Sequence, residues 1–214
     1  IGPGIWRQTQ KAFEEADSIN ADYIIIEMNT YGGLLDAADS IRTKILNEQK
    51  PVYVFINNNA ASAGALISIA CDRIYMRSGA NIDAATVVNQ TGEQMPDKYQ
   101  AYMRSLMRAT AEAHGKDTII EGNDTIFKWK RDPLIAEAMV DSRTVIEGLV
   151  DSSRVLSFTT EEAIKYGFCE GKAENIEEVI KKAGIENYEI KRFTLTSLEK
   201  VIGWLVNPVV SGLL

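Results

Sequence analysis

Two stretches of the chain share one pattern, in which an apolar strand is followed by a loop of small residues and then by a helix. They are DYIIIEMNTYGGLLDAADSI, residues 22–41, and PVYVFINNNAASAGALISIA, residues 51–70. Strands alternating with helices form parallel sheets, which bind ligands outside the carboxyl ends of their strands. The sequence therefore predicts an α/β fold in which the loops Thr30–Gly33 and Asn57–Ser62 meet at one site.

Hydrophobic periodicity and helix-capping residues predict the other elements. Helices are expected at 6–21, within 34–50 with Leu35, Ala38, Ile41 and Ile45 on one face, from Pro96 to about His114, from Thr159 to near Gly167, and at 175–185 ending in Gly184. A short strand is expected at 71–77 and a long loop at 79–95. A length of 214 residues favours a single domain.

Composition excludes some classes of function. The net charge is −7 and the basic residues are scattered, whereas nucleic-acid binding needs a clustered basic face. Cys71 and Cys169 are too far apart for a metal-binding or redox motif and are expected to be buried free thiols. No cofactor or metal site is predicted.

Ser62 is the first candidate for chemistry, because it lies where a strand gives way to an apolar helix. The plain alternative is an N-cap, the commonest role of a serine before a helix. Small residues surround it, namely Ala60, Ala61, Ala63 and Gly64. They leave the backbone uncrowded, as a nucleophile requires and a cap does not.

The loop after the first strand supplies a second candidate feature, the pair Gly32–Gly33. Acyl transfer needs two N–H donors for the developing oxyanion. The N–H groups of Gly33 and Ala63 are suited to that role, although two glycines after a strand also form ordinary turns.

A nucleophilic serine also needs a base. The only histidine, His114, is expected near a helix C-terminus, where it interacts with the helix dipole, so a Ser-His-Asp triad is not predicted. Lys98 lies in the first turn of the long helix, where the dipole disfavours a charged amine and so favours a base. A solvated surface lysine is the alternative.

Five segments together resemble the NfeD group of membrane-bound serine proteases, in the Clp protease and crotonase superfamily and related to signal peptide peptidase A. They are NTYGG, NNNAASAGALISIACDRIYM, AYMRSLMRATAEAHG, LIAEAMVD and LSFTTEEAIKYGFCEG. The resemblance implies a crotonase-like, Clp protease-like spiral of βα units over residues 1–190. It also implies a Ser-Lys dyad that cleaves apolar peptide segments, with Ser62 as nucleophile and Gly33 and Ala63 as oxyanion donors.

The resemblance further implies partners and a location. The expected partners are a peptide or protein substrate, a stomatin-like membrane protein and other copies of the chain. Residues 191–214 would lead to a membrane region, with the catalytic domain extracytoplasmic. The apolar end VIGWLVNPVVSGLL, residues 201–214, is shorter than a membrane span, so it is either the start of one or a packing helix.

The chain departs from the family pattern in three places. Tyr31 replaces a common proline, and Gln94 stands where a gapless match would place the catalytic lysine, one turn before Lys98. Thr118–Asp132 is an insertion, expected to be a surface hairpin, a lid or a partner contact. Gln94 motivates an alternative function, a non-catalytic scaffold of a membrane complex. An acyl-CoA hydratase or isomerase is a third possibility, but it leaves Ser62 without a role.

Overall fold

The helices and strands alternate along the chain in the predicted α/β order. The computed structural model describes residues 1–89, 91–121 and 124–196. Its helices are α1 (Pro3–Ser18), α2 (Leu35–Leu46), α3 (Ala63–Ala70), α4 (Asp97–Glu112), α5 (Pro133–Ala138), α6 (Thr160–Lys165) and α7 (Ile176–Lys182). Its strands are β1 (Ile24–Thr30), β2 (Val52–Ala61), β3 (Arg73–Met76), β4 (Asn81–Asp83), β5 (Lys116–Glu121), β6 (Asp124–Trp129), β7 (Phe158–Thr159) and β8 (Gly171–Lys172).

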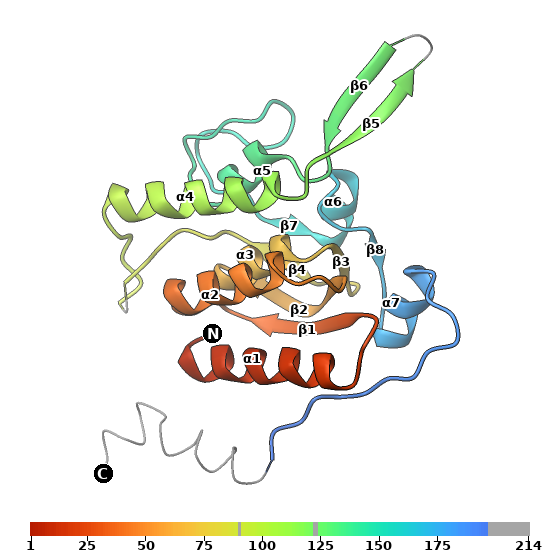
Figure 1. Cartoon of the computed structure of the whole chain (residues 1–214). Coiled ribbons are helices and arrows are strands. Elements are labelled where there is room, and N and C mark those ends of the chain that lie inside the picture. The colour runs from red at the N-terminus through yellow and green to blue at the C-terminus, as the bar shows by residue number, and fades with distance from the viewer. Residues whose placement is uncertain (90, 122–123, 197–214) are drawn as a thin grey trace, which may run out of the picture.

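Strand β2 is the centre of a six-stranded sheet (Figure 1). Its first half lies parallel to β1 on one side, with Val52 opposite Ile24, and parallel to β3 on the other. Its second half pairs in parallel with β4, with Ala60 opposite Ile82. Strand β8 continues the sheet beyond β3, and β7 pairs antiparallel with β4. Because β1 and β2 are parallel, the turns that follow them lie at the same edge of the sheet.

The side chains of β2 alternate between two buried clusters. Val52, Val54 and Ile56 face the larger core, to which α2, α3, α4 and α5 contribute. Tyr53 and Phe55 point to the opposite face, where α7 covers them. Successive strand residues point to opposite faces, and both faces are buried here. This burial explains why the strand is apolar at every position in PVYVFI.

Capping residues set the starts of α6 and α7, and the cap at Thr159 is the one predicted. In α6 the Thr159 hydroxyl accepts the N–H of Glu162, and the Glu162 carboxylate accepts the N–H of Thr159. Helix α7 begins after Asn175, whose side chain accepts a backbone N–H three residues later. Gly167 and Gly184 follow these helices with φ of 76° and 75°. The predicted bounds of both helices are therefore confirmed.

The predicted loop Asn57–Ser62 is wrong for most of its length, because β2 continues to Ala61. Asparagine and alanine have low β-propensity, which favoured a loop in the sequence. Pairing decides otherwise, since β4 pairs with residues 59–61 and Thr30 of β1 pairs with Ala60. Strand β4 itself lies inside the predicted long loop at 79–95. The turn is confined to Ser62.

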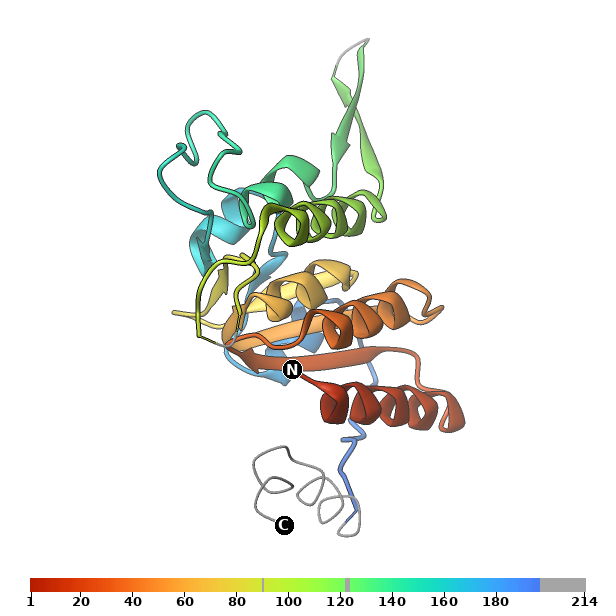
Figure 2. The same ribbon diagram turned by 90° about the vertical axis from the view of Figure 1, so that its left-hand side faces the viewer.

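The insertion forms most of an antiparallel hairpin of β5 and β6, so the predicted surface hairpin is confirmed. Both views show it standing away from the sheet and helices (Figures 1 and 2). At its base the N–H of Lys130 donates to the carbonyl of Gly115, and the Lys116 amine lies 4.2 Å from the ring centroid of Trp129.

The C-terminal segment 201–214 lies outside the described residues, so the two predictions for it stay predictions. None of the helices within the described ranges is long and apolar enough to span a bilayer. Residues 188–196 have no regular secondary structure.

Candidate active site

Ser62 forms a sharp turn between β2 and α3. Its backbone has φ 53° and ψ −111°, a conformation that costs a non-glycine residue about 1–3 kcal/mol. Its side chain makes no capping hydrogen bond to α3, so the ordinary N-cap is excluded. A strained strand-to-helix turn that exposes a serine hydroxyl is the arrangement of nucleophile elbows in hydrolases.

The glycine loop after β1 lies directly against this serine. A Cβ atom at Gly32 would lie 3.0 Å from Cβ of Ser62 and 3.4 Å from its Oγ. Gly32 also has φ 118°, which other residues rarely adopt. The Thr30 hydroxyl shapes the loop by accepting the N–H of Gly32 at 3.1 Å and donating to its carbonyl at 3.2 Å. The predicted convergence of the two turns is therefore confirmed.

The backbone N–H groups of Gly33 and Ala63 donate to no group among the residues that the structure describes. Gly33 packs against Ile1, whose amine donates to the carbonyl of Gly32 at 2.7 Å and whose carbonyl accepts the N–H of Leu34 at 2.9 Å. The N–H of Gly32 is bound by Thr30, and that of Ser62 by a carbonyl described below. Ala63 is the first residue of α3, where N–H groups have no partner within the helix. A backbone donor without an acceptor next to a serine can receive an oxyanion.

The Ser62 turn is held in place by residues far away in the sequence. Its N–H donates to the carbonyl of Ala84 at 3.1 Å, and the N–H of Ala84 donates to Oγ of Ser157 at 3.1 Å. The next N–H, of Ala85, donates to the carbonyl of Met139 at 2.6 Å. Ser157 therefore positions Ser62 through the backbone of Ala84.

The small residues around Ser62 also have a packing role that the sequence did not indicate. A Cβ atom at Gly64 would lie 2.6 Å from Cγ2 of Thr30 and 3.5 Å from Cβ of Ala60. Gly64 thus lets the start of α3 pack against the ends of β1 and β2. This packing brings the serine turn and the glycine loop together.

Lys98 is the second residue of α4, and its position in the first helical turn is as predicted. The side chain is exposed, and its amine lies 4.9 Å from the ring centroid of Tyr99. No hydrogen bond or ion pair joins Lys98 to another residue of the described ranges, Ser62 included. The structure therefore does not bring the candidate base into contact with the candidate nucleophile.

The loop that precedes α4 is anchored by Gln100, which is 3% exposed. Its amide donates to the carbonyls of Val87 at 2.7 Å and Met95 at 3.0 Å, and accepts the N–H of Val87 at 3.0 Å. Gln94 lies on this loop with an exposed side chain. Gln100 therefore sets the path of the chain from β4 to Lys98.

His114 lies near the C-terminal end of α3, whereas Ser62 lies at its start. Its Nε2 donates to the carbonyl of Ile69 at 2.7 Å. The eight residues of α3 separate the two side chains by about 12 Å. Burial, helped by the positive charge of Arg131, lowers the pKa of His114 to about 4. His114 is therefore neutral at pH 7 and donates a hydrogen bond to the C-terminal end of α3. The predicted charge–dipole interaction with the end of its own helix α4 is wrong.

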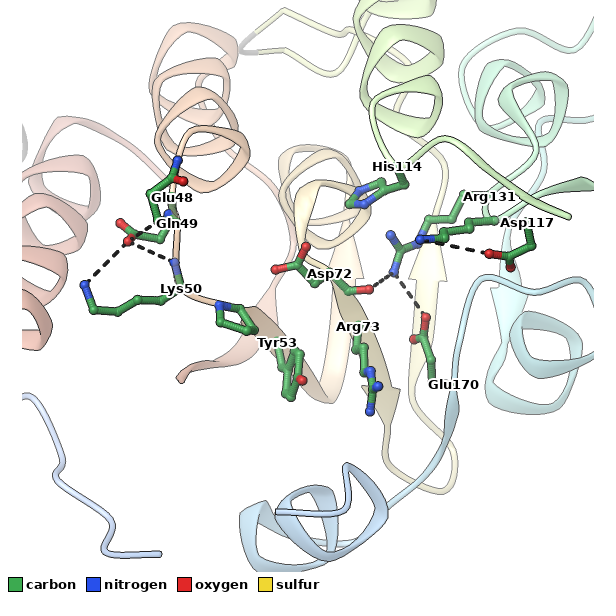
Figure 3. Close-up of a pocket in the computed structure, with 12 residues that line it drawn as sticks. Glu48, Gln49, Lys50, Tyr53, Asp72, Arg73, His114, Asp117, Arg131 and Glu170 are labelled. Atoms are coloured by element: carbon green, nitrogen blue, oxygen red, sulfur yellow. Dashed lines mark hydrogen bonds and ion pairs between the residues drawn. The ribbon is translucent and has the colours of Figure 1, made fainter. Parts of the chain in front are cut away.

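Arg131 binds the same end of α3 and is only 2% exposed. Its guanidinium donates to the carbonyls of Ile69 and Asp72 at 3.4 and 3.3 Å and pairs with Glu170 at 3.4 Å. Figure 3 shows Arg131, Asp72 and Glu170 near His114, and these residues line a groove of about 510 Å³. The charged side chains that line it are balanced, four cationic and four anionic: Lys50, Arg73, Lys130, Arg131, Glu48, Asp72, Asp117 and Glu170.

The groove lies away from Ser62, the nucleophile suggested by the sequence. Its lining includes Pro51 and Arg73, which lie at the starts of β2 and β3, whereas Ser62 follows the carboxyl end of β2. Ligands of parallel sheets bind at the carboxyl ends of the strands. The Ser62 turn, and not this groove, is therefore the candidate active site.

The cysteines do not compete with Ser62 as nucleophiles. Cys71 and Cys169 are both buried and free, as predicted. Burial raises the pKa of both thiols, that of Cys169 to about 12, so little thiolate exists at neutral pH.

Residues 1–193 match the family model described as "NfeD1b, N-terminal domain". The chain belongs to this family. It is 31% identical over its full length to the membrane protein NfeD1b of Bacillus subtilis (strain 168), and covers 46% of that protein. It is 27% identical over 93% of its length to the membrane-bound protease PH1510 of Pyrococcus horikoshii, and covers 44% of it. The chain thus spans about half the length of these relatives.

Solved structures show the fold of this NfeD1b domain. A variant of the 1510-N membrane-bound stomatin-specific protease, in complex with a substrate peptide, matches with a TM-score of 0.72 and 25% identity, covering 94% of this chain and 90% of that one. ClpP1 of Listeria monocytogenes, 18% identical, has a TM-score of 0.56 and covers 84% and 89%. An enoyl-CoA hydratase of Mycobacterium marinum, 18% identical, has a TM-score of 0.55 and covers 86% and 71%. The predicted Clp protease-like, crotonase-like fold is confirmed.

Proposed function

We propose that this NfeD1b domain is a serine endopeptidase with Ser62 as its nucleophile. The observation that carries the proposal is the strained turn at Ser62, which leaves the hydroxyl uncapped beside the Gly32–Gly33 loop. Relationship to a membrane-bound protease supports the reaction class. The packing of Gly64 and the anchoring by Ala84 hold the turn in this geometry before substrate arrives.

In the proposed reaction, Oγ of Ser62 attacks the scissile carbonyl carbon and its proton passes to a base. The carbonyl oxygen becomes an oxyanion that accepts hydrogen bonds from Gly33 and Ala63, each donor contributing roughly 10²–10³ in rate. The C–N bond then breaks, the base returns the proton to the leaving amine, and water hydrolyses the acyl-enzyme.

Lys98 is the proposed base. Solved structures of 1510-N include variants in which a lysine or a serine is replaced by alanine, the former with a substrate peptide. No ion pair within the described chain holds the amine of Lys98, and the loop before it is fixed at Gln100 rather than at Lys98. For Lys98 to accept the proton of Ser62, the first turn of α4 must move inward when substrate binds. Catalytic contacts often tighten only in the complex.

The proposed substrate is an apolar peptide segment. Tyr31 and Leu34, on either side of the glycine pair, are 85% and 53% exposed, and Val88 on the loop after β4 is 52% exposed. Apolar side chains left in water beside a candidate nucleophile are suited to an apolar chain. Since 1510-N is named as stomatin-specific, a stomatin-like membrane protein is the proposed substrate or partner.

The setting of the domain belongs to the same proposal. A protease domain over residues 1–190 would be followed by a membrane region reached through residues 191–214. Both curated relatives are membrane proteins by name, which supports membrane association. We further propose an extracytoplasmic catalytic domain and a homo-oligomer.

The test of the nucleophile is cleavage of an apolar fluorogenic peptide by the wild-type chain and by Ser62→Ala. The matched control is Ser68→Ala, which removes a buried hydroxyl of the same helix that has no hydrogen-bond partner within the described structure. We expect Ser62→Ala to lose cleavage to background while Ser68→Ala keeps the wild-type rate. Equal rates for wild type and Ser62→Ala would end the proposal.

The base has its own test. Lys165 also lies over the ring of the tyrosine that follows it, at 5.0 Å against 4.9 Å for Lys98. Lys165→Ala is therefore the matched control and should keep the wild-type kcat. Lys98→Ala should lower kcat by at least about 10², within the usual range for general-base catalysis. Full activity of Lys98→Ala would remove the base assignment and leave Ser62 in place.

A second candidate function is a non-catalytic scaffold that keeps the fold. It is favoured by the position of Lys98, whose exposed amine lies over Tyr99 without contacting Ser62. A crystal structure of Ser62→Ala with an apolar peptide bound would separate the two. An amine of Lys98 within hydrogen-bond reach of the position that Oγ of Ser62 occupies in the wild type supports catalysis, and an amine still over Tyr99 supports the scaffold.

A further inference from the structure

The β5–β6 hairpin exposes more apolar surface than an isolated hairpin normally does. Ile120 is 75% exposed, Phe127 64% and Ile126 44%. In both views the hairpin projects from the body (Figures 1 and 2). A lone two-stranded hairpin is marginally stable in water, whereas three or more strands are self-supporting. An exposed apolar hairpin is therefore expected to gain a partner.

The outer edge of β6 is available for such a partner. Within the described chain β5 and β6 form a sheet of their own, in which β6 pairs only with β5. Residues 124–128 of β6 are all exposed. Unpaired N–H and C=O groups on a sheet edge are a template for another strand, and natural edges usually avoid exposed apolar residues.

We infer that the partner is a second copy of this chain, joined by antiparallel pairing of β6 with β6. With a two-fold axis at Ile126, this residue lies opposite its own copy. Thr125 then lies opposite Phe127 of the second copy, and Asp124 opposite Lys128. Opposite charges and apolar side chains placed directly across a strand pair both stabilise it. In this one register Ile126 contacts its own copy, and the two-fold symmetry forms the Asp124–Lys128 pair twice.

On one face of the combined sheet Lys128 would lie between two acidic residues, and Asp124 between Lys128 of the second copy and Glu121 of its own hairpin. Lys128 already lies opposite Asp117 within its own hairpin. In the paired form it would lie between that carboxylate and Asp124 of the second copy, and the result is a four-stranded sheet. A two-fold pairing covers the β6 edge of both copies, and the β5 strands become the outer edges of the four-stranded sheet.

The β5 edge does not offer the same match. A two-fold axis at Thr118 sets Lys116 opposite Ile120 and Asp117 opposite Ile119, so no charge meets an opposite charge. The β6 edge is therefore the one assigned to the second copy.

The hairpin does not act as a lid in this assignment. Its base adjoins His114 and Arg131, which bind the end of α3 opposite to Ser62. Pairing through β6 therefore leaves the Ser62 turn accessible. The inference names a surface for self-association and does not depend on the proposed peptidase activity.

The test is sedimentation velocity of the 214-residue chain from about 1 to 100 μM, a range suited to weak interfaces. Asp124→Lys and Lys128→Asp each place like charges opposite one another at two positions. Each should weaken the dimer by about tenfold or more, from the energies of cross-strand charge pairs. Mixing the two single variants one to one, or combining both changes in one chain, restores opposite charges and should restore the dimer.

Asp22→Lys is the control, since it reverses an exposed carboxylate outside the hairpin and should leave the dimer unchanged. Circular dichroism checks that each variant is folded. A wild-type chain that stays monomeric over this range overturns the inference, as does a dimer that neither single reversal weakens. Loss in both single variants without recovery in the mixture also overturns it, because the two residues then do not face one another.

Discussion

The two ends of helix α3 differ sharply in how far their polar groups are satisfied. At the C-terminal end, His114 and Arg131 both donate to the carbonyl of Ile69. At the N-terminal end, Ser62 holds a strained backbone, its hydroxyl caps nothing, and the N–H of Ala63 donates to no described residue. The polar groups at the C-terminal end are thus paired within the protein, whereas the N–H of Ala63 at the other end is the group for which we propose a substrate oxygen as acceptor.

The apolar body of α3 explains how one short helix supports both ends. All eight of its residues are buried, so the helix is fixed by packing rather than by its caps. The strain at Ser62 is then offset by burial elsewhere, as is typical of functional turns. Substitutions at each end of α3 test this contrast.

Gly32→Ala should have the largest effect, on the reactive end. The added methyl group meets Cβ of Ser62 at 3.0 Å and the backbone must leave φ 118°, so the glycine loop moves and kcat/KM of peptide cleavage should fall by roughly 10²–10³. Gly79→Ala is the control, since Gly79 has φ 78° but open space around it. It should lose about 1 kcal/mol of unfolding free energy and keep its activity. Equal activities of the two variants would contradict the close approach of the loop.

Arg131→Met tests the closed end. It removes a buried cation that binds two carbonyls and Glu170, so the free energy of unfolding should fall by about 2–4 kcal/mol. Arg108→Met removes an exposed partner of Glu137 and should cost less than about 1 kcal/mol. Urea unfolding measures both. Activity per folded molecule should stay unchanged in Arg131→Met, and a selective loss of activity would mean that the ends are coupled.

The pH dependence of stability reports on His114. Its folded pKa of about 4 lies below the ordinary 6.5, so the unfolded state takes up the proton first as the pH falls. The contribution is complete above pH 6.5 and is lost between pH 6.5 and 4, by up to about 3 kcal/mol. In His114→Gln this part of the pH profile should flatten. A profile identical to that of the wild type would contradict the buried neutral imidazole.

Ser157→Ala should have the smallest effect. The N–H of Ala84 loses its acceptor, while the carbonyl that binds the N–H of Ser62 remains. We expect a loss of about 1 kcal/mol in unfolding free energy and a few-fold decrease in kcat. Ser153→Ala, at an exposed turn of the same loop, should leave kcat unchanged. An unaltered kcat in Ser157→Ala would show that Ala84 needs no such support.

The sequence predicted the parts of the molecule that depend on local pattern. The βα units, the cap at Thr159 and the approach of the two loops follow from periodicity, capping residues and strand direction. The extension of β2 through Asn57–Ala61 was missed, because it depends on pairing with β4 and Thr30. Local residue propensities contain no information about that pairing.

The candidate site was predictable only in part, for the same reason. The residue types and spacing around Ser62 indicated a nucleophile, but its strained backbone and the support from Ser157 arise from contacts between distant segments. Arg131 carried no signal, because a charged residue between a hairpin and a helix is ordinarily exposed. His114 was expected at a helix end, yet the helix it partners is α3, which folding alone brings close.

The most direct test of the central claim is covalent labelling by a serine-directed fluorophosphonate, with the site located by peptide mass spectrometry. We expect one adduct, on Oγ of Ser62, that is absent in Ser62→Ala, strongly slowed in Gly32→Ala and unchanged in Ser68→Ala and Gly79→Ala. No adduct on folded protein, or labelling at the same rate in Gly32→Ala as in the wild type, would contradict a hydroxyl activated between the two turns.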